Sequence, residues 1–233
     1  LFYNPDITNN TPSFTFDKNE SRHIVKVLRK KERDSLHLTN GKGFLFTAEI
    51  ISANDKKCTI KIISSEEIQK SWNYYLHVAI APTKMNDRYE WFLEKATEIG
   101  IDEISPIICD NSERRVIKTE RMQKVIVSAA KQSLKYTFPK LNEPISFKEF
   151  IQKDHKGVKL IAHCEDTIKN TLKNLIEPQQ DVVIMIGPEG DFSLKEIELA
   201  LRHKYIPLSL GKSRLRTETA GIVVCNTLSI INE

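Results

Sequence analysis

The hydrophobic and polar positions divide the chain at a polar connector, residues 66–73. Before it, three segments alternate apolar and polar residues, as half-buried strands do, at 35–39, 43–52 and 57–64. The Asn-Gly step between the first two favours a hairpin turn, because it tolerates positive φ. Ser21–Lys31 predicts a helix with an apolar stripe. We therefore expect a small β-rich first domain at residues 1–70.

After the connector, short apolar segments alternate with segments of helical period. The expected strands are Tyr74–Ala81, Ile104–Cys109, Val158–His163, Val182–Ile186 and Ile206–Leu210. The expected helices include Arg88–Ile99, Glu120–Leu134, Phe147–Lys153, Thr167–Leu175 and one that starts at a Ser193/Glu196 capping box. This alternation is typical of an α/β fold with a parallel sheet, here in a second domain at residues 74–233.

Two of the expected strands lead into loops suited to a ligand. Gly187-Pro188-Glu189-Gly190-Asp191-Phe192 follows the first, and Gly211 to Thr217 follows the second. Open α/β sheets bind small molecules at the carboxyl ends of their strands. The first loop lacks the lysine of a phosphate loop and the GxGxxG spacing, so it favours a neutral or cationic adenosine-type ligand over a pyrophosphate. The alternatives are a plain strand-to-helix turn for the first loop, and a helix cap with a salt bridge at Arg216–Glu218.

Positive charge is concentrated in two stretches. The chain carries 35 Lys and Arg against 31 Asp and Glu, a net charge of +4. Basic side chains crowd residues 22–33 and again 112–140, where Gln132, Lys135 and Tyr136 mix amide, cationic and aromatic groups. Phosphates attract such cations and unstacked bases pack on aromatic rings, which suggests an RNA partner. A solvated helix face is the alternative for each stretch.

The four cysteines are scattered singly without CxxC spacing, and no window approaches 18 apolar residues. This pattern argues against a zinc site, a disulfide framework or a membrane span. We expect a cytoplasmic protein with reduced thiols and no bound metal.

Several motifs, in order along the chain, resemble one known family. They are HIVKVLRKKERD with TNGKG, then KMNDRYEWFLEKATEIGIDEISPI, NSERRVIK, AAKQSLKYTFP, IGPEG and LSLGKSRLRTETAG. Together they resemble the family of methyltransferases that modify uracil N3 in small-subunit ribosomal RNA, within the SPOUT superfamily. The resemblance covers essentially the whole chain. Asp191 stands where the family loop more often has a second glycine.

The resemblance implies a SPOUT-type parallel sheet with a C-terminal trefoil knot, and a PUA-like β-barrel at residues 1–70 that binds RNA. It implies S-adenosyl-L-methionine as cofactor, a homodimer and no metal. The implied reaction is methylation of N3 of a specific uridine in 16S ribosomal RNA of the small ribosomal subunit. The alternatives are a SPOUT methyltransferase that acts on another RNA, or an RNA-binding protein without enzymatic activity.

The resemblance also assigns residues by position. Cofactor binding falls to His163, Cys164, Glu165, Ile186, Gly187, Pro188, Gly190, Leu208, Leu210, Gly211, Leu215, Thr217, Thr219 and Ala220. Because uracil N3 must lose a proton as it is methylated, the site needs a base or a group that stabilises the developing anion. Arg216, Glu189 and Glu218 are the catalytic candidates. RNA binding falls to Arg22, Lys26, Arg29, Lys30, Arg88, Arg114, Arg115, Gln132 and Lys135.

Overall fold

The computed structural model describes residues 1–165 and 168–233, which form two units. The first unit combines Leu1–Lys70 with Ala130–Phe138, and the second combines Ser71–Ala129 with Pro139–Glu233. The break after Lys70 falls within the polar connector, but the sequence had placed residues 130–138 in the second domain. Backbone hydrogen bonds explain their place in the first unit. Gly43 N donates to Tyr136 O and Phe138 N donates to Gly41 O, both at 2.9 Å.

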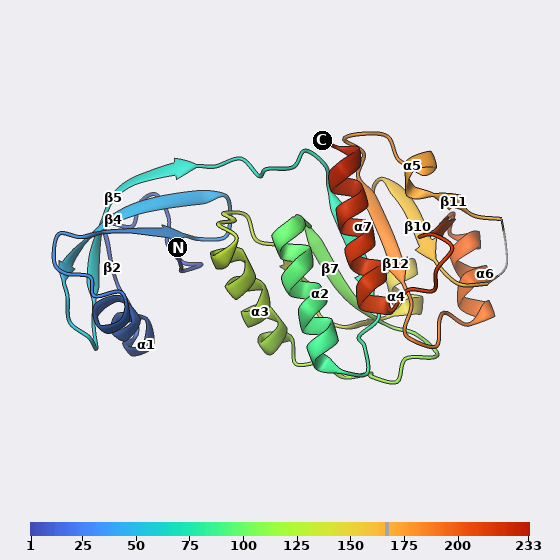
Figure 1. The fold of residues 1–233 in the computed structure, drawn as a ribbon, viewed down its shortest axis with the longest axis horizontal. Helices are drawn as coiled ribbons and strands as arrows, with labels where there is room; N and C mark the ends of the chain where they lie inside the picture. Colours follow the sequence, from blue (N-terminus) through green and yellow to red (C-terminus); the bar gives the residue numbers. More distant parts are fainter. Residues whose placement is uncertain (166–167) are drawn as a thin grey trace. The chain divides into compact units, whose positions relative to one another are not determined.

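The first unit contains an N-terminal sheet (Figure 1). Its strand order is β1-β3-β4-β5-β2. Its strands are β1 (Phe2–Tyr3), β2 (Ser13–Thr15), β3 (Ser35–Thr39), β4 (Phe44–Ser52) and β5 (Thr59–Glu67). Alternate residues of β3 and β4, such as Leu36, Leu38 and Phe46, are buried. The expected helix consists of α1 (Lys18–Arg22) and a π-helical turn at His23–Val27. The three alternating strands and the helix are therefore present, with shifted ends, whereas β1 and β2 are too short to show a period.

A parallel sheet forms the second unit, with eight strands in the described part of the chain, and this confirms the expected α/β class. The order along the sheet is β11-β13-β10-β12-β6-β7-β8, with β9 beside β7. The strands are β6 (Leu76–Ile80), β7 (Glu103–Ile108), β8 (Lys140–Leu141), β9 (Ile145–Ser146), β10 (Val158–Ala162), β11 (Asn170–Thr171), β12 (Val182–Ile186) and β13 (Ile206–Ser209). The main helices are α2 (Asn86–Ile99), α3 (Thr119–Gln132), α4 (Phe147–Ile151), α6 (Leu194–Arg202) and α7 (Thr217–Ile231).

One expected helix is wrong over much of its length. Thr167–Leu175 was predicted to be helical, and its first residue lies outside the described residues. Asn170 and Thr171 pair with Leu208 and Ser209 of β13, so their backbone is extended. The helix α5 therefore begins only at Leu172 and ends at Leu175.

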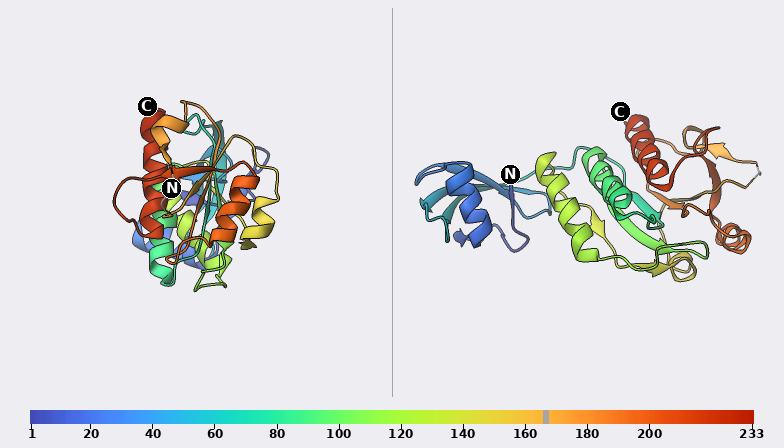
Figure 2. Two further views of the ribbon diagram at one scale, coloured as in Figure 1. Left: turned by 90° about the vertical axis from the view of Figure 1, so that its right-hand side faces the viewer. Right: turned by 60° about the horizontal axis from the view of Figure 1, so that its bottom comes forward.

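Both faces of this sheet are covered by helices, as Figures 1 and 2 show. Val182, Ile184 and Ile186 of β12 pack in the cluster that includes α2 and α7. Val183 and Met185 pack in the cluster that includes α4 and α6. Because successive side chains of a strand point to opposite faces, a continuous apolar run is what a strand buried on both sides requires.

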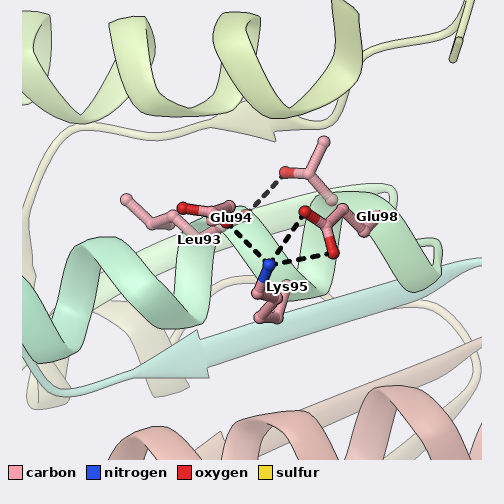
Figure 3. A network of polar contacts seen from close by, with 5 residues as sticks. Leu93, Glu94, Lys95 and Glu98 are labelled. Atoms are coloured by element: carbon pink, nitrogen blue, oxygen red, sulfur yellow. Dashed lines mark hydrogen bonds and ion pairs between the residues drawn. The ribbon is translucent and has the colours of Figure 1, made fainter. Parts of the chain in front are cut away.

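The two long helices α2 and α7 pack closely at a glycine. A Cβ on Gly221 of α7 would lie 2.5 Å from Phe92 of α2 and 3.1 Å from Ile80 of β6. On another part of α2, Lys95 Nζ donates to Glu94 at 2.7 Å and to Glu98 at 3.0 Å (Figure 3). Ion pairs at a surface contribute little to stability, so the buried contact at Gly221 is the stricter constraint.

We predict that Gly221→Ala destabilises the protein by about 1–3 kcal/mol, because the added methyl group overpacks a filled interface. The measurement is the free energy of unfolding in urea. Asn226→Ala, at an exposed position of α7, is the matched control and should leave stability nearly unchanged. Equal free energies of unfolding for the two variants would show that α2 and α7 can move apart to accept the methyl group without loss of stability.

A polar pocket of about 490 Å³ lies at the amino ends of β6, β7 and β12, the edge opposite the ligand loops. His77 Nε2 and Ser105 Oγ are 2.8 Å apart, and Asn142 Nδ2 donates to both Ser105 and Glu103. Glu103 also accepts a hydrogen bond from the Tyr75 hydroxyl. Burial lowers the pKa of His77 to about 4, so this imidazole is neutral at pH 7.

The burial of His77 predicts acid sensitivity. A histidine whose pKa is about 4 when folded and near 6.5 when unfolded stabilises the fold fully above pH 6.5. That contribution is lost as the pH falls from 6.5 to 4, by up to roughly 3 kcal/mol. We expect His77→Gln to flatten the stability profile across this window in urea titrations, whereas His203→Gln should keep the slope. An unchanged slope in His77→Gln would contradict the assignment.

Candidate active site

The strands that carry the ligand loops end in one row. Ala162 of β10 pairs with Ile186 of β12, and Ile186 pairs with Ile80 of β6. On the other side Leu208 of β13 pairs with Ala162. Because the strands are parallel and in register, the loops that follow them start at the same level of the sheet. This row brings the segments after residues 80, 162, 186 and 209 to one edge.

The loop after β12 is a tight turn. Asp191 N donates to Pro188 O at 2.9 Å, and Gly187 lies against the Phe192 ring, 3.1 Å from where its Cβ would be. Asp191 has a φ of 61°, in the left-handed region. The capping box is confirmed, with Ser193 and Glu196 bonded reciprocally at the start of α6.

Residues after β7 hold this turn from another side, and the sequence reasoning did not single them out. Asn111 Nδ2 donates to Gly190 O and to Asp191 O, both at 3.1 Å. Ser193 Oγ donates to Asp110 Oδ2 at 2.6 Å. The signal was available, because Asp110 and Asn111 are polar residues just beyond the carboxyl end of a buried strand.

The segment after β6 contacts the same turn through Glu189. Glu189 Oε1 accepts a hydrogen bond from Lys84 N at 2.9 Å. The Arg114 guanidinium donates to Thr83 O at 3.1 Å and to Lys84 O at 2.6 Å. Arg114 was predicted to bind RNA, and in the structure these nitrogens bind backbone carbonyls. It therefore fixes the segment that holds Glu189.

The start of α7 completes the edge. Thr217 Oγ1 donates to Gly187 O at 3.0 Å. The N-cap residue of α7 is Arg216, whose side chain makes no capping hydrogen bond, and the Thr217 hydroxyl binds the neighbouring loop. Glu218 is buried, and one carboxylate oxygen lies 3.9 Å from Arg88 Nε. The Arg216 side chain is exposed.

His163 is a buried polar side chain at the end of β10. Neither of its ring nitrogens has a hydrogen-bond partner among the described residues. Burial lowers its pKa, with a further contribution from Lys169, so the ring is neutral near pH 7. Buried polar atoms are normally satisfied, so this ring has capacity for a ligand. The next residue, Cys164, donates its backbone N–H to Asp191 Oδ2 at 2.7 Å.

The structure places the predicted cofactor residues in three groups. Apolar members of the set lie in the core below the loops, namely Ile186, Leu208 and Ala220, with Leu210 and Leu215 packed beside them. Gly187, Pro188, Gly190, Gly211, Thr217 and Thr219 lie in or directly beside the loops, and Gly211 has a φ of 119°. His163, Cys164 and Glu165 follow β10, with the last two exposed. All of them belong to the second unit.

The predicted RNA-binding residues are divided between the units. Arg22, Lys26, Arg29, Lys30, Gln132 and Lys135 belong to the first unit, and Arg88, Arg114 and Arg115 to the second. In the first unit, Arg29, Lys30 and Lys31 line an open pocket of about 510 Å³. In the second, Arg115 donates to Asp110 O at 2.9 Å.

The carboxyl edge offers backbone groups, an unsatisfied imidazole and apolar side chains. That donor set fits an adenosine-type ligand, which binds through apolar contacts and a few fixed hydrogen bonds. Among residues 1–165 and 168–233, no group of His, Cys, Asp and Glu is arranged to hold a metal ion. In the same residues, no helix combines the length and apolar character needed to cross a bilayer.

Comparison with protein families identifies both parts of the chain. Residues 70–229 match the model of the RNA methyltransferase domain, and residues 16–63 match the RNA methyltransferase PUA domain. The chain belongs to this RNA methyltransferase family. The carboxyl edge described above therefore lies within its methyltransferase domain.

Three related proteins match this chain along most of their own length. A Buchnera aphidicola protein named ribosomal RNA small subunit methyltransferase E is 32% identical over 92% of this chain and 87% of its own. A Porphyromonas gingivalis structure named a probable rRNA-methyltransferase is 43% identical, with a TM-score of 0.93 over 99% of this chain and 97% of its own. A Neisseria gonorrhoeae ribosomal RNA small subunit methyltransferase E, bound to S-adenosyl methionine, is 26% identical with a TM-score of 0.88 over the same shares.

We predict that Thr217→Val destabilises the methyltransferase domain by about 1–3 kcal/mol, because it leaves the Gly187 carbonyl without its donor. Thr217→Ser keeps the hydroxyl and is the matched control. Thermal unfolding followed by circular dichroism measures both. If Thr217→Val and Thr217→Ser unfold at the same temperature, the hydroxyl does not hold the start of α7 against the loop after β12.

Proposed function

We propose that this protein transfers a methyl group from S-adenosyl-L-methionine to N3 of a specific uridine in 16S ribosomal RNA of the small ribosomal subunit. The row of loops at one edge of the parallel sheet, with the unsatisfied His163 ring beside it, is the observation that carries the proposal. The small-subunit names of the relatives and the S-adenosyl methionine of the Neisseria structure support the substrate and the cofactor.

The proposal includes a trefoil knot at the carboxyl end of the chain. After β12 the chain forms α6 and then β13, which pairs with the far side of β10. It then returns to α7, whose first residue contacts Gly187 beyond β12. A connection that runs from β13, beside β10, to a helix whose first residue contacts the loop after β12 supports the proposed knot.

The cofactor, when bound, supplies a methyl group on a sulfonium, an electrophile that needs no metal. The task of the protein is to hold the uracil ring in line with that methyl group and to remove the N3 proton. In our proposal Arg216, exposed at the start of α7, stabilises the negative charge that develops on O2 and O4 of the uracil.

Glu189 is our candidate for the base. Its Oε1 is held by Lys84 N, which fixes the carboxylate, and its side chain lies on the exposed side of the turn. Glu218 is less suited, because it is buried and faces Arg88 at 3.9 Å. We assign Glu218 the role of orienting Arg88, which would help to hold the flipped-out uridine.

RNA binding is proposed for both units. The N-terminal sheet matches a PUA domain of RNA methyltransferases, and we propose that it forms the PUA-like barrel implied by the sequence. We propose that its exposed Arg22, Lys26 and Arg29 contact phosphates, together with Lys30. In the second unit Arg88 and Arg115 would contact the target, as would Gln132 and Lys135 of the segment that joins the first unit. We further propose a homodimer and a cytoplasmic location, where ribosomal subunits assemble.

The decisive experiment maps the modified nucleotide. Mass spectrometry of 16S ribosomal RNA from cells with and without the gene should show one methylated uridine that disappears with the gene and returns on complementation. Loss of a methyl group from another RNA would indicate a different substrate for the same family. No change in any RNA, together with no calorimetric binding of S-adenosylmethionine, would indicate an RNA-binding protein without this activity.

We predict that Arg216→Ala lowers kcat by about 10²–10³-fold, as expected when a charge-stabilising donor is removed. Glu189→Gln should lower it by about 10²-fold if the carboxylate is the base. Methylation of purified small subunits measures both, with binding of S-adenosylhomocysteine as the check on the cofactor site. Arg202→Ala, on the exposed side of α6, is the control. Near-normal turnover in Arg216→Ala would remove that residue from the mechanism.

A further inference from the structure

Asp191 connects two of the loops through its carboxylate. Its Oδ1 accepts a hydrogen bond from Phe192 N at 2.8 Å, within its own turn. Its Oδ2 accepts one from Cys164 N at 2.7 Å, in the segment that follows β10. Hydrogen bonds to an ionised acceptor are about twice as strong as those between neutral groups. The Asp191 side chain therefore binds a backbone amide in each of the two loops.

The backbone of Asp191 is itself held in place. Asn111 Nδ2 binds its carbonyl oxygen, and its own N–H binds Pro188 O. Its φ of 61° lies in the left-handed region, where aspartate is tolerated better than most residues but glycine is favoured. A glycine here would satisfy the turn without connecting it to Cys164. The carboxylate thus adds a contact that the turn alone does not require.

The segment that receives this bond contains the unsatisfied His163. Cys164 and Glu165 are exposed, and Lys169 Nζ donates to His163 O at 2.8 Å. The hydrogen bond from Cys164 N to the Asp191 carboxylate joins this segment to the loop after β12. Without it, ordering of His163–Glu165 would have to accompany ligand binding, and affinity would fall by that cost.

We propose that Asp191 is a positioning residue that fixes the His163–Glu165 segment against the loop after β12, so that the cofactor pocket is formed before the cofactor arrives. This rests on the proposed function for the identity of the ligand, but the contact itself does not. The residue acts through Cys164 and His163 and takes no part in the methyl transfer.

The test compares Asp191→Gly with Asp191→Asn. Glycine keeps the backbone conformation and removes both acceptors, whereas asparagine keeps one neutral acceptor. We expect the dissociation constant of S-adenosylhomocysteine, measured by calorimetry, to rise about tenfold in Asp191→Gly and only about two- to threefold in Asp191→Asn. The melting temperature and the kcat at saturating cofactor should stay near the wild-type values, because only the order of the free loop changes.

Cys164 provides a readout that needs no cofactor. Its thiol is exposed, whereas Cys58, Cys109 and Cys225 are buried. Burial and the neighbouring Asp191 raise the pKa of this thiol. We expect iodoacetamide to alkylate Cys164 several-fold faster in Asp191→Gly than in Asp191→Asn, which removes the same charge but keeps one acceptor, as followed by peptide mass spectrometry. Cys164→Ser keeps the backbone donor and identifies the labelled site.

The two readouts separate the two proposals. Suppose that alkylation is faster in Asp191→Gly than in Asp191→Asn, while even the wild type binds no S-adenosylhomocysteine. This result would support the positioning role of Asp191 and contradict the proposed function. Wild-type affinity and wild-type alkylation in Asp191→Gly would overturn the role of Asp191. If that variant does not fold, wild-type values for both measurements in Asp191→Asn, together with equal values in Asp191→Ala, would also overturn it.

Discussion

The register of the parallel strands is the constraint on which the rest of the second unit depends. Ile80, Ala162, Ile186 and Leu208 lie in one row, so four connections leave the sheet at the same height. A shift of one residue in a single strand would reverse its buried faces and displace its loop. Alternate residues of β12 are buried in clusters on both sides, so such a shift would move each of its side chains from one cluster into the other.

Given that row, short polar contacts set the shape of the edge. Asn111, Arg114 and Thr217 all donate to backbone carbonyls of segments far from them in sequence. The carboxylates of Glu189 and Asp191 accept from backbone amides in the same way. Side chains that bind backbone fix a loop whatever the identity of the loop residues, which leaves the loop side chains available for chemistry.

Apolar runs such as VVIMI were enough to predict β6, β7, β10, β12 and β13, whereas the two-residue strands β8 and β9 were too short to be recognised. Hydrophobic period could not place Asn170–Thr171, where two exposed residues become a strand only by pairing with β13. The loops after β12 and β13 were recognisable from composition. The roles of Asn111 and of the Thr217 hydroxyl were not, because each depends on a partner that only the folded chain brings near. The carbonyl partners of Arg114 could not be predicted either, because Thr83 and Lys84 come near it only in the folded chain.

The placement of residues 130–138 has a consequence for synthesis on the ribosome. Tyr136 O accepts from Gly43 N and from the Thr39 hydroxyl, and Phe138 packs beside Tyr3 and donates to Gly41 O. The N-terminal unit thus lacks part of its own structure until residue 138 has left the exit tunnel. Its folding cannot be completed before the first half of the methyltransferase domain has been translated. The two units are therefore expected to mature together, although most of one precedes the other in the sequence.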